Sequence, residues 1–226
     1  MKTIQEIKTD IDVLVRKQGN QGALKLGDVL DEIVDTISIT LSSIPDVATF
    51  SAAVPSTATE IKFAYSGDVN LTGYTKTTSI GVTIDVYAND TKYVIVSPLP
   101  IYAPSSCSSM FASKRALTSL DLSNFNTTNV TLMSYMFSDC AALTSLNLSN
   151  FNTTNVEDMY DMFDGCSGLT TIIANNWSAA GDSSGMFNGC TSLVGGNGTT
   201  YDSNHTDASY AHIDVTDNPG YFTAPA

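Results

Sequence analysis

Histidine is the side chain that most readily gives and takes a proton near neutral pH, and this chain has two, His205 and His212. Both lie in a C-terminal stretch without regular hydrophobic periodicity. The motifs of nucleophile elbows, zinc proteases, phosphate-binding loops and dinucleotide-binding folds do not occur. We therefore expect no enzymatic activity, no catalytic residue and no cofactor.

Carboxylates are densest in one short segment that contains Glu157, Asp158, Asp161 and Asp164. Carboxylate oxygens are the ligands that hard cations prefer, so a cation site is one interpretation. The spacing is not that of an EF-hand loop, and on a helix it would spread these groups around a short region. We favour a solvated acidic face and predict no metal.

Three cysteines occupy one position of a repeating pattern. Cys140, Cys166 and Cys190 each follow a Phe by three residues, at spacings of 26 and 24. Lys114 takes this position in the first repeat, and Cys107 lies in another phase. We expect the thiols to be buried in a core, because free Cys is among the most buried residue types, with a disulfide or a metal site as the alternatives.

The pattern itself is a tandem repeat. Leu117–Val130 reappears almost unchanged as Leu143–Val156. A period of about 20–29 residues with a Leu-x-x-Leu-x-Leu core predicts a leucine-rich solenoid, whose turns bury their apolar faces against one another. The period is marked by the pairs Met110-Phe111, Met136-Phe137, Met162-Phe163 and Met186-Phe187.

Within each repeat, Leu-x-Leu pairs predict short parallel strands. Val130–Cys140 and Val156–Cys166 carry apolar residues at helical spacing. The first turn is atypical, as a capping turn should be, and the stack is expected to end near the glycine-rich stretch 195–198. The predicted repeat core is Met110, Phe111, Leu120, Leu122, Met136, Phe137, Cys140, Leu146, Leu148, Met162, Phe163, Cys166, Met186, Phe187 and Cys190.

Charge is distributed unevenly along the 226 residues, whose formal net charge is -13. All ten Lys and Arg lie at or before Arg115, whereas residues 116–226 hold eleven Asp or Glu. Nucleic-acid binding by that half is therefore not expected. The N-terminus lacks the apolar stretch of a secretory signal. The sequence also lacks an apolar run of 18 residues, so we predict no membrane-spanning helix.

Residues 1–37 are predicted to be helical in two pieces separated by Gly19–Gly22. Isoleucine at both heptad positions favours three-stranded association, so we favour a coiled-coil-like oligomerising anchor over a helical hairpin that packs on its own domain. The anchor residues are Ile4, Ile7, Ile11, Leu14, Leu26, Leu30, Ile33 and Ile37.

From residue 38 to 100 the hydrophobic period changes to two. Ile80, Val82, Ile84 and Val86 alternate, and a turn then precedes Tyr93–Val96, which together predict a β-hairpin. Ile61–Tyr65 is a further strand. We expect a small antiparallel β-domain at 38–100, a boundary near 98–104, and an α+β fold whose residues 101–226 are the leucine-rich-repeat solenoid and its capping tail.

Asparagine recurs in the turns of the repeats, at Asn124, Asn150 and Asn176. These side chains are expected to bond to main-chain groups of the turns. Exposed Asn and Thr rows could also contact glycans, which offer hydroxyl groups rather than charge.

Three elements resemble a known family. They are Tyr102-Ala-Pro-Ser-Ser, the repeated Met-Phe-x-x-Cys-x-x-Leu-Thr-Ser-Leu-x-Leu-Ser-Asn-Phe-Asn-Thr-Thr-Asn-Val unit, and Asn218-Pro-Gly-Tyr-Phe222. Over about residues 101–223 the chain is similar to the 26-residue BspA-like leucine-rich surface-protein repeats of gut Bacteroidetes and their phages. The resemblance implies a right-handed solenoid used for adhesion or recognition. Residues 7–20 also resemble the N-termini of structural proteins of Bacteroides phages, including the crAss-like group.

These features predict a structural virion protein of a bacteriophage, such as a head or tail fibre or a capsid decoration protein. We expect a homotrimer whose N-terminus binds other virion proteins of the capsid or tail, and whose repeats attach to a glycan or protein on the host surface. The alternative is a secreted or cell-surface bacterial adhesin. The expected location is the virion or, in the alternative, the bacterial surface.

Overall fold

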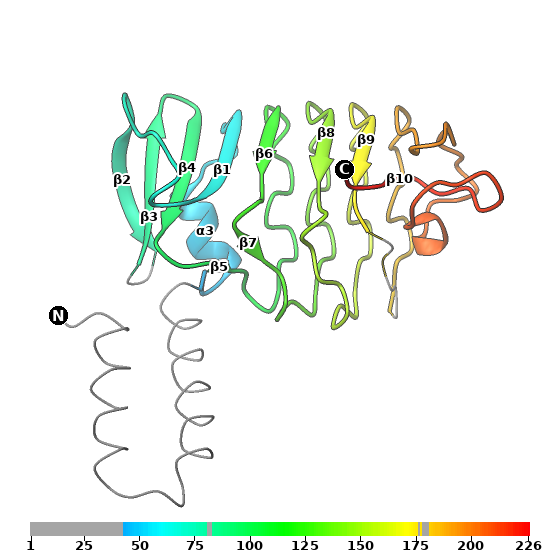
Figure 1. The fold of residues 1–226 in the computed structure, drawn as a ribbon, viewed down its shortest axis with the longest axis horizontal. Helices are drawn as coiled ribbons and strands as arrows, with labels where there is room; N and C mark the ends of the chain where they lie inside the picture. Colours follow the sequence, from blue (N-terminus) through cyan, green and yellow to red (C-terminus); the bar gives the residue numbers. More distant parts are fainter. Residues whose placement is uncertain (1–42, 81–82, 176, 178–180) are drawn as a thin grey trace, which may run out of the picture. The chain divides into compact units, whose positions relative to one another are not determined.

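The computed structural model describes residues 43–80, 83–175, 177 and 181–226 (Figure 1). In these ranges the fold is mostly β, with one short α-helix and several small parallel or mixed sheets. The expected α+β class depended on helices within residues 1–37. That segment, with the anchor residues from Ile4 to Ile37, lies outside the described residues, as do Val82 and Asn176.

A five-stranded sheet stands at one end of the described unit, the repeat turns follow, and the C-terminal tail covers the other end (Figure 1). The strands are ordered β2-β3-β4-β1-β6, β10-β9-β8 and β5-β7. No helix within the described ranges is long and apolar enough to cross a bilayer. In chain order the elements are α3 (Val47–Ala53), β1 (Glu60–Tyr65), β2 (Thr75–Ile80), β3 (Ile84–Asn89), β4 (Lys92–Ser97), β5 (Ile101–Tyr102), β6 (Ser119–Asp121), β7 (Phe125–Asn126), β8 (Ser145–Asn147), β9 (Thr171–Ile173), the 3-10 helix η1 (Ala208–Tyr210) and β10 (Phe222–Thr223).

The first sheet is mixed. Strands β2, β3 and β4 are antiparallel, and β3 and β4 form the predicted hairpin, although Ile80, expected on the same strand as Ile84, ends β2 and pairs with Ile84. Strand β1 lies parallel to both β4 and β6. The prediction of a purely antiparallel domain was therefore wrong. Alternation of apolar residues identifies the buried face of a strand, and it carries no information on the direction of the neighbouring strands.

Helix α3 was not predicted. The Asp46 side chain caps it by accepting a hydrogen bond from the Thr49 N–H at 2.6 Å. Phe50 is fully buried, with its ring centroid 6.0 Å from that of Phe63 and 5.4 Å from that of Phe111. A helix of seven residues spans too few turns to show a clear apolar period in the sequence.

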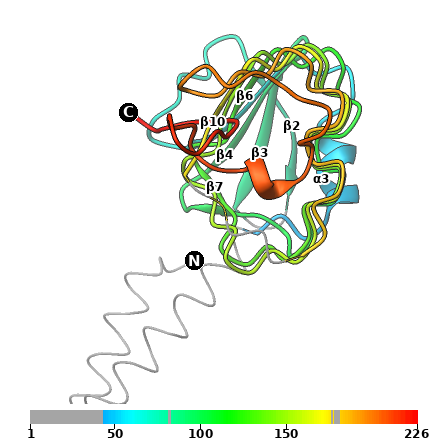
Figure 2. The ribbon, with the colours of Figure 1, turned by 90° about the vertical axis from the view of Figure 1, so that its right-hand side faces the viewer.

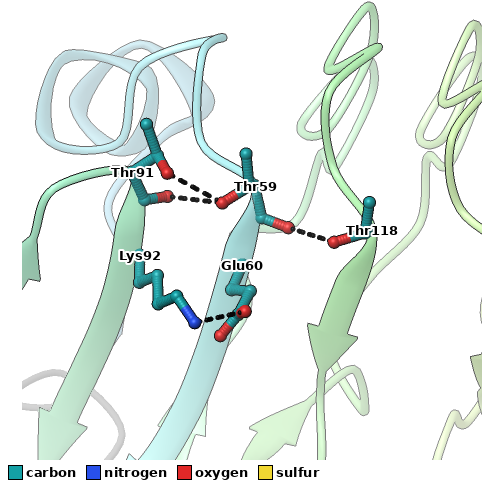
Figure 3. A network of polar contacts seen from close by, with 5 residues as sticks. All are labelled: Thr59, Glu60, Thr91, Lys92 and Thr118. Carbon is teal, nitrogen blue, oxygen red and sulfur yellow. Dashed lines mark hydrogen bonds and ion pairs between the residues drawn. The ribbon is translucent and has the colours of Figure 1, made fainter.

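Thr59 links the sheet to the first repeat (Figure 3). The main-chain N–H and the hydroxyl of Thr118 both donate to the Thr59 carbonyl, at 2.8 and 3.1 Å. On its other side the Thr59 hydroxyl lies 2.9 Å from that of Thr91, and the Lys92 ammonium lies 2.7 Å from the Glu60 carboxylate. The sheet is thus joined to the stack by side chains as well as by the β1–β6 pairing.

Lys114 is buried at the same junction. Its ammonium group donates to the carbonyls of Val54 and Pro55, at 2.9 and 3.1 Å, just beyond the end of α3. It also lies 5.9 Å from the centroid of the Phe50 ring. Burial lowers the pKa of Lys114. The residue that replaces the repeat cysteine therefore fastens the first turn to the helix.

Main-chain hydrogen bonds hold the repeat turns together. From Met133 to Asp139, every second N–H donates to a carbonyl of the next turn, at 2.7–2.9 Å. The N–H groups of Met136, Ser138 and Cys140 instead donate three residues back within their own turn. The turns consequently lie one behind another when viewed along the stack (Figure 2). We call the segments 107–114, 133–140, 159–166 and 183–190 the arcs. The first three follow this pattern, whereas the last keeps the bonds within its own turn and donates to the tail through the Phe187 N–H.

The helical spacing seen in Val130–Cys140 and Val156–Cys166 does not produce helices. The chain reverses at left-handed residues four apart, such as Tyr135 at φ 56° and Asp139 at φ 60°. Each arc is therefore a series of tight turns. Such turns repeat about every four residues, so their inward-pointing apolar side chains have nearly the same sequence spacing as those of a helix.

All fifteen residues assigned to the repeat core are buried. One continuous core runs from Ile44 to Phe222 and includes side chains of the first sheet, so no gap in packing separates residues 43–100 from the repeats. The arcs contribute a stacked phenylalanine column with ring centroids 5.5, 5.4 and 5.6 Å apart. Its members are Phe111, Phe137, Phe163 and Phe187.

The C-terminal tail covers the last turn. The Phe187 N–H donates to the Thr206 carbonyl at 2.9 Å, and the Tyr221 ring packs edge-on against Phe187 at 5.1 Å. Buried Asp214 accepts hydrogen bonds from the N–H and hydroxyl of Thr199, at 2.9 and 2.6 Å. Burial acts to raise the pKa of Asp214, but these hydrogen bonds hold it below its usual value.

We predict that Leu146→Asp unfolds the stack, because Leu146 is 1% exposed and the variant buries an unpaired carboxylate. Loss of a buried Leu side chain alone costs ~2–5 kcal/mol. Urea denaturation should show a loss at the upper end of that range or beyond it. The control is Ser145→Asp at the adjacent exposed position, expected to change stability by less than ~0.5 kcal/mol. A Leu146→Asp variant as stable as the parent would contradict the register of β8.

Candidate binding surface

Strands β6, β8 and β9 bury their central side chains, Leu120, Leu146 and Ile172. Because successive side chains of a strand point to opposite faces, the flanking residues form the outer face of the stack. That face is composed mostly of hydroxyl and amide groups. Its residues are Ser119 and Asp121 on β6, Ser145 and Asn147 on β8, and Thr171 and Ile173 on β9.

Two adjoining hollows lie on the strand side of the first two turns. The first has a volume of 330 Å³, and its polar lining includes Asp121, Asn147 and Ser149. The second has a volume of 270 Å³ and extends to Tyr65 at the end of β1. Ser123 and Asn150 line both hollows. We call the two hollows together the trough; its remaining lining residues are Leu120, Leu122, Pro100, Asn124, Phe125, Asn126 and Thr128.

The trough coincides with an interruption of the strand ladder. β6 pairs with β1 in the five-stranded sheet, and β8 pairs with β9 in the three-stranded sheet. No pairing joins β6 to β8 in the described structure, although the arcs of the same two turns are bonded to each other. The facing edges of β6 and β8 therefore keep main-chain groups that no neighbouring strand uses.

The predicted role of the turn asparagines is confirmed for Asn150. Its side-chain N–H group donates to the carbonyls of Leu122 and Phe125 in the previous turn, at 2.9 and 3.1 Å. Asn124 differs. It is buried, with 4% of its surface exposed, and neither its amide nitrogen nor its amide oxygen has a hydrogen-bond partner among the described residues. Asn176 lies outside the described residues.

Asp121 is the carboxylate of the trough. Its side chain accepts a hydrogen bond from the Ser123 N–H at 3.0 Å and lies 3.4 Å from the Lys62 ammonium. Burial acts to raise the pKa of Asp121, but the Ser123 hydrogen bonds and the Lys62 charge hold it below its usual value. The group is thus an ionised acceptor whose charge is partly balanced by Lys62.

Sequence reasoning named Asn and Thr rows as possible glycan contacts but did not identify these residues. The Leu-x-Leu alternation could have located Asp121 and Asn147, since each occupies the outward middle position. Nothing in the sequence marks Tyr65 as their neighbour, because it comes from a strand outside the repeat.

The predicted acidic residues lie in the third turn, with Asp161 and Asp164 in its arc and Glu157 and Asp158 just before it. Asp158 accepts from the Tyr160 N–H at 2.9 Å, and Asp164 accepts from the Asn188 amide at 3.0 Å. Burial, with the nearby Asp164 and Asp182 carboxylates, raises the pKa of Asp161. No three potential ligands are grouped closely enough to hold a metal ion within the described residues.

The two histidines belong to the tail. The His205 ring stacks on Tyr210 with centroids 4.3 Å apart, and the His212 ring lies 6.4 Å from the same ring. A third hollow of 660 Å³ is lined there by Tyr201, Asp202 and His205 among others. Because one face of the His205 ring is covered by Tyr210, the aromatic groups mainly hold the tail together.

All four cysteines are buried free thiols. In the repeated position the S–H groups of Cys140, Cys166 and Cys190 donate to phenylalanine carbonyls of the previous turn, at 3.1, 3.0 and 3.1 Å. Burial raises the pKa of Cys107, Cys140 and Cys190 to about 12, and that of Cys166 in the same direction. The thiols are therefore neutral in the folded protein and act as small core groups.

We predict that stability falls as the pH rises from about 9 toward 12. The unfolded thiols ionise near pH 9.0 and the folded Cys140 thiol near 12, so the folded state binds more protons in this window. Each thiol should cost about 1 kcal/mol per pH unit there. Urea denaturation at pH 8.5 and 10.5 would measure how steeply the free energy of unfolding falls with pH. Cys140→Ala removes one thiol and should make this dependence less steep by that thiol's contribution. Equal slopes for parent and variant would contradict the assignment.

Comparison with family models matches residues 105–208 to the family described as "Mycoplasma protein of unknown function, DUF285". Comparisons with curated proteins and with solved structures found no match. The matched range begins just before the first arc and ends in the tail, so it covers the stacked turns. The chain therefore carries, at residues 105–208, a DUF285 domain, which is related to leucine-rich surface repeats.

Proposed function

We propose that this chain is a structural virion protein of a bacteriophage, a head or tail fibre or a decoration protein, whose stack is a leucine-rich-repeat solenoid that binds the host surface. The observation that carries the recognition role is the outer strand face. The inward-pointing residues of β6 and β8 are apolar and buried. Their outward-pointing residues are Ser, Asp and Asn, and the trough lies beside them. A face with these groups suits contact with a hydrated surface.

Charge supports a partner other than nucleic acid. Residues 116–226 contain no Lys or Arg, so phosphate groups would be repelled from most of the stack. Neutral glycans or polar protein surfaces fit better, because they interact through hydroxyl, amide and carbonyl groups.

The attachment role rests on residues 1–37. Heptad spacing of isoleucines there favours a trimer, and the resemblance of residues 7–20 to phage structural proteins favours docking on the capsid or tail. The second candidate function is a secreted or cell-surface adhesin, which the surface-repeat domain at residues 105–208 favours equally. The two differ in where the chain is found, and in whether its N-terminus oligomerises.

We predict a trimer that becomes a monomer when residues 1–37 are deleted, because the heptad isoleucines supply the contacts between chains. Light scattering of the purified chain at micromolar concentration measures this. The double variant Ile7→Asp, Ile11→Asp should have the same effect without shortening the chain. A monomer before and after truncation would contradict the trimeric anchor.

Two further measurements test the proposed role. Fluorescently labelled full chain should stain a subset of Bacteroides strains, and staining of none would contradict host recognition. Mass spectrometry of purified phage particles should find the chain in the virion. Its presence in the bacterial envelope fraction of uninfected cells would instead decide for the adhesin.

A further inference from the structure

The break between β6 and β8 is unusual because the two strands belong to nearly identical repeats. Thr170 bonds to the Thr144 carbonyl through both its N–H and its hydroxyl, at 2.9 Å each, and β8 and β9 are fully paired. The preceding pair of turns has arcs that are bonded in the same way, and the Asn150 side chain also joins its turns, yet its strands β6 and β8 are unpaired. The first hollow occupies this place.

The trough offers hydrogen-bonding groups of both kinds on its two sides. Asp121 supplies acceptors from β6, while Asn147 supplies an amide that can donate and accept from β8. Ser123 and Ser149 add hydroxyl groups at the following positions. None of the residues that line the trough is Lys or Arg, so its chemistry suits a neutral ligand rather than a phosphate.

An aromatic ring and a buried amide occur at the other end of the trough. Tyr65 is 40% exposed and lines the second hollow. The negative face of an aromatic ring attracts the weakly positive C–H groups of a sugar ring. Asn124 lines the same hollow with its amide group unpartnered among the described residues, which is a rare state for a buried polar side chain.

We infer that the trough is the recognition site of this protein and that it binds a neutral glycan on the host surface. Tyr65 stacks on one sugar ring, and Asp121, Asn147 and Ser149 bond to the hydroxyls of the next. Sugar hydroxyls both donate and accept, as these side chains require. This assignment rests on the proposed function, because it names the ligand class and the site through which the stack would attach.

The test uses the full chain and intact cells of a strain that it stains. Ser149→Trp fills the trough with an indole ring and should reduce the apparent affinity for cells by at least about tenfold. Asn147→Ala removes one hydrogen-bonding group without adding bulk and should reduce affinity by a smaller factor. The control is Ile173→Trp, which places the same ring at the outward position of β9 that corresponds to Asn147, where the strands are paired.

Each variant is first compared with the parent by thermal denaturation, so that loss of binding is read only from folded protein. Periodate, which cleaves vicinal diols of sugars, should abolish staining, whereas proteinase treatment of the cells should not. Staining that survives periodate and is lost after proteinase would overturn the glycan assignment. If Ser149→Trp and Asn147→Ala both stain cells as strongly as the parent, the trough is not the binding site. The proposed function would still stand in that case, because the chain would still bind the cells.

Discussion

Hydrogen bonding from one turn to the next is the constraint on which this structure depends. In the first three arcs every second N–H donates to the following turn, and N–H groups such as those of Met136, Ser138 and Cys140 close tight turns within their own arc. This alternation requires a nearly constant number of residues per turn, and the Met-Phe pairs recur at 26, 26 and 24. Equivalent side chains therefore stack in columns, and the Phe and Cys columns follow directly from the main-chain bonding.

A stack of this kind has two ends with unpaired main-chain groups, and both ends are covered. At the first turn, β1 pairs with β6 and buried Lys114 bonds to the carbonyls that follow α3. At the last turn, the tail supplies the Thr206 carbonyl, and Asp214 fixes the loop that holds Thr199. The sheet thus serves as the cap of the stack, which explains why one core continues through both.

Direct repetition made the register of the stack predictable, and the buried columns follow from it. The left-handed residues of the arcs were not predictable, because Tyr135 at φ 56° is an unusual residue for that conformation and a four-residue turn imitates helical spacing. The β6–β8 break was hidden for a stronger reason. Leu117–Val130 and Leu143–Val156 differ only in that Asp121 is replaced by Asn147, and β6 pairs with a strand from outside the repeat whereas β8 pairs with the next repeat strand.

That difference in neighbours also determines where a ligand is expected along the stack. β6 is a repeat strand whose partner β1 brings Lys62 and Tyr65 beside repeat residues. The Lys62 ammonium balances Asp121, whereas the third turn carries Asp158, Asp161 and Asp164, and no basic residue follows Arg115 in the sequence. The junction therefore combines hydrogen-bonding groups with little net charge, and the more distant turns are acidic. Desolvating the junction costs a neutral ligand less free energy than desolvating the acidic turns. The junction between the sheet and the first turns is therefore the part of the surface best suited to recognition.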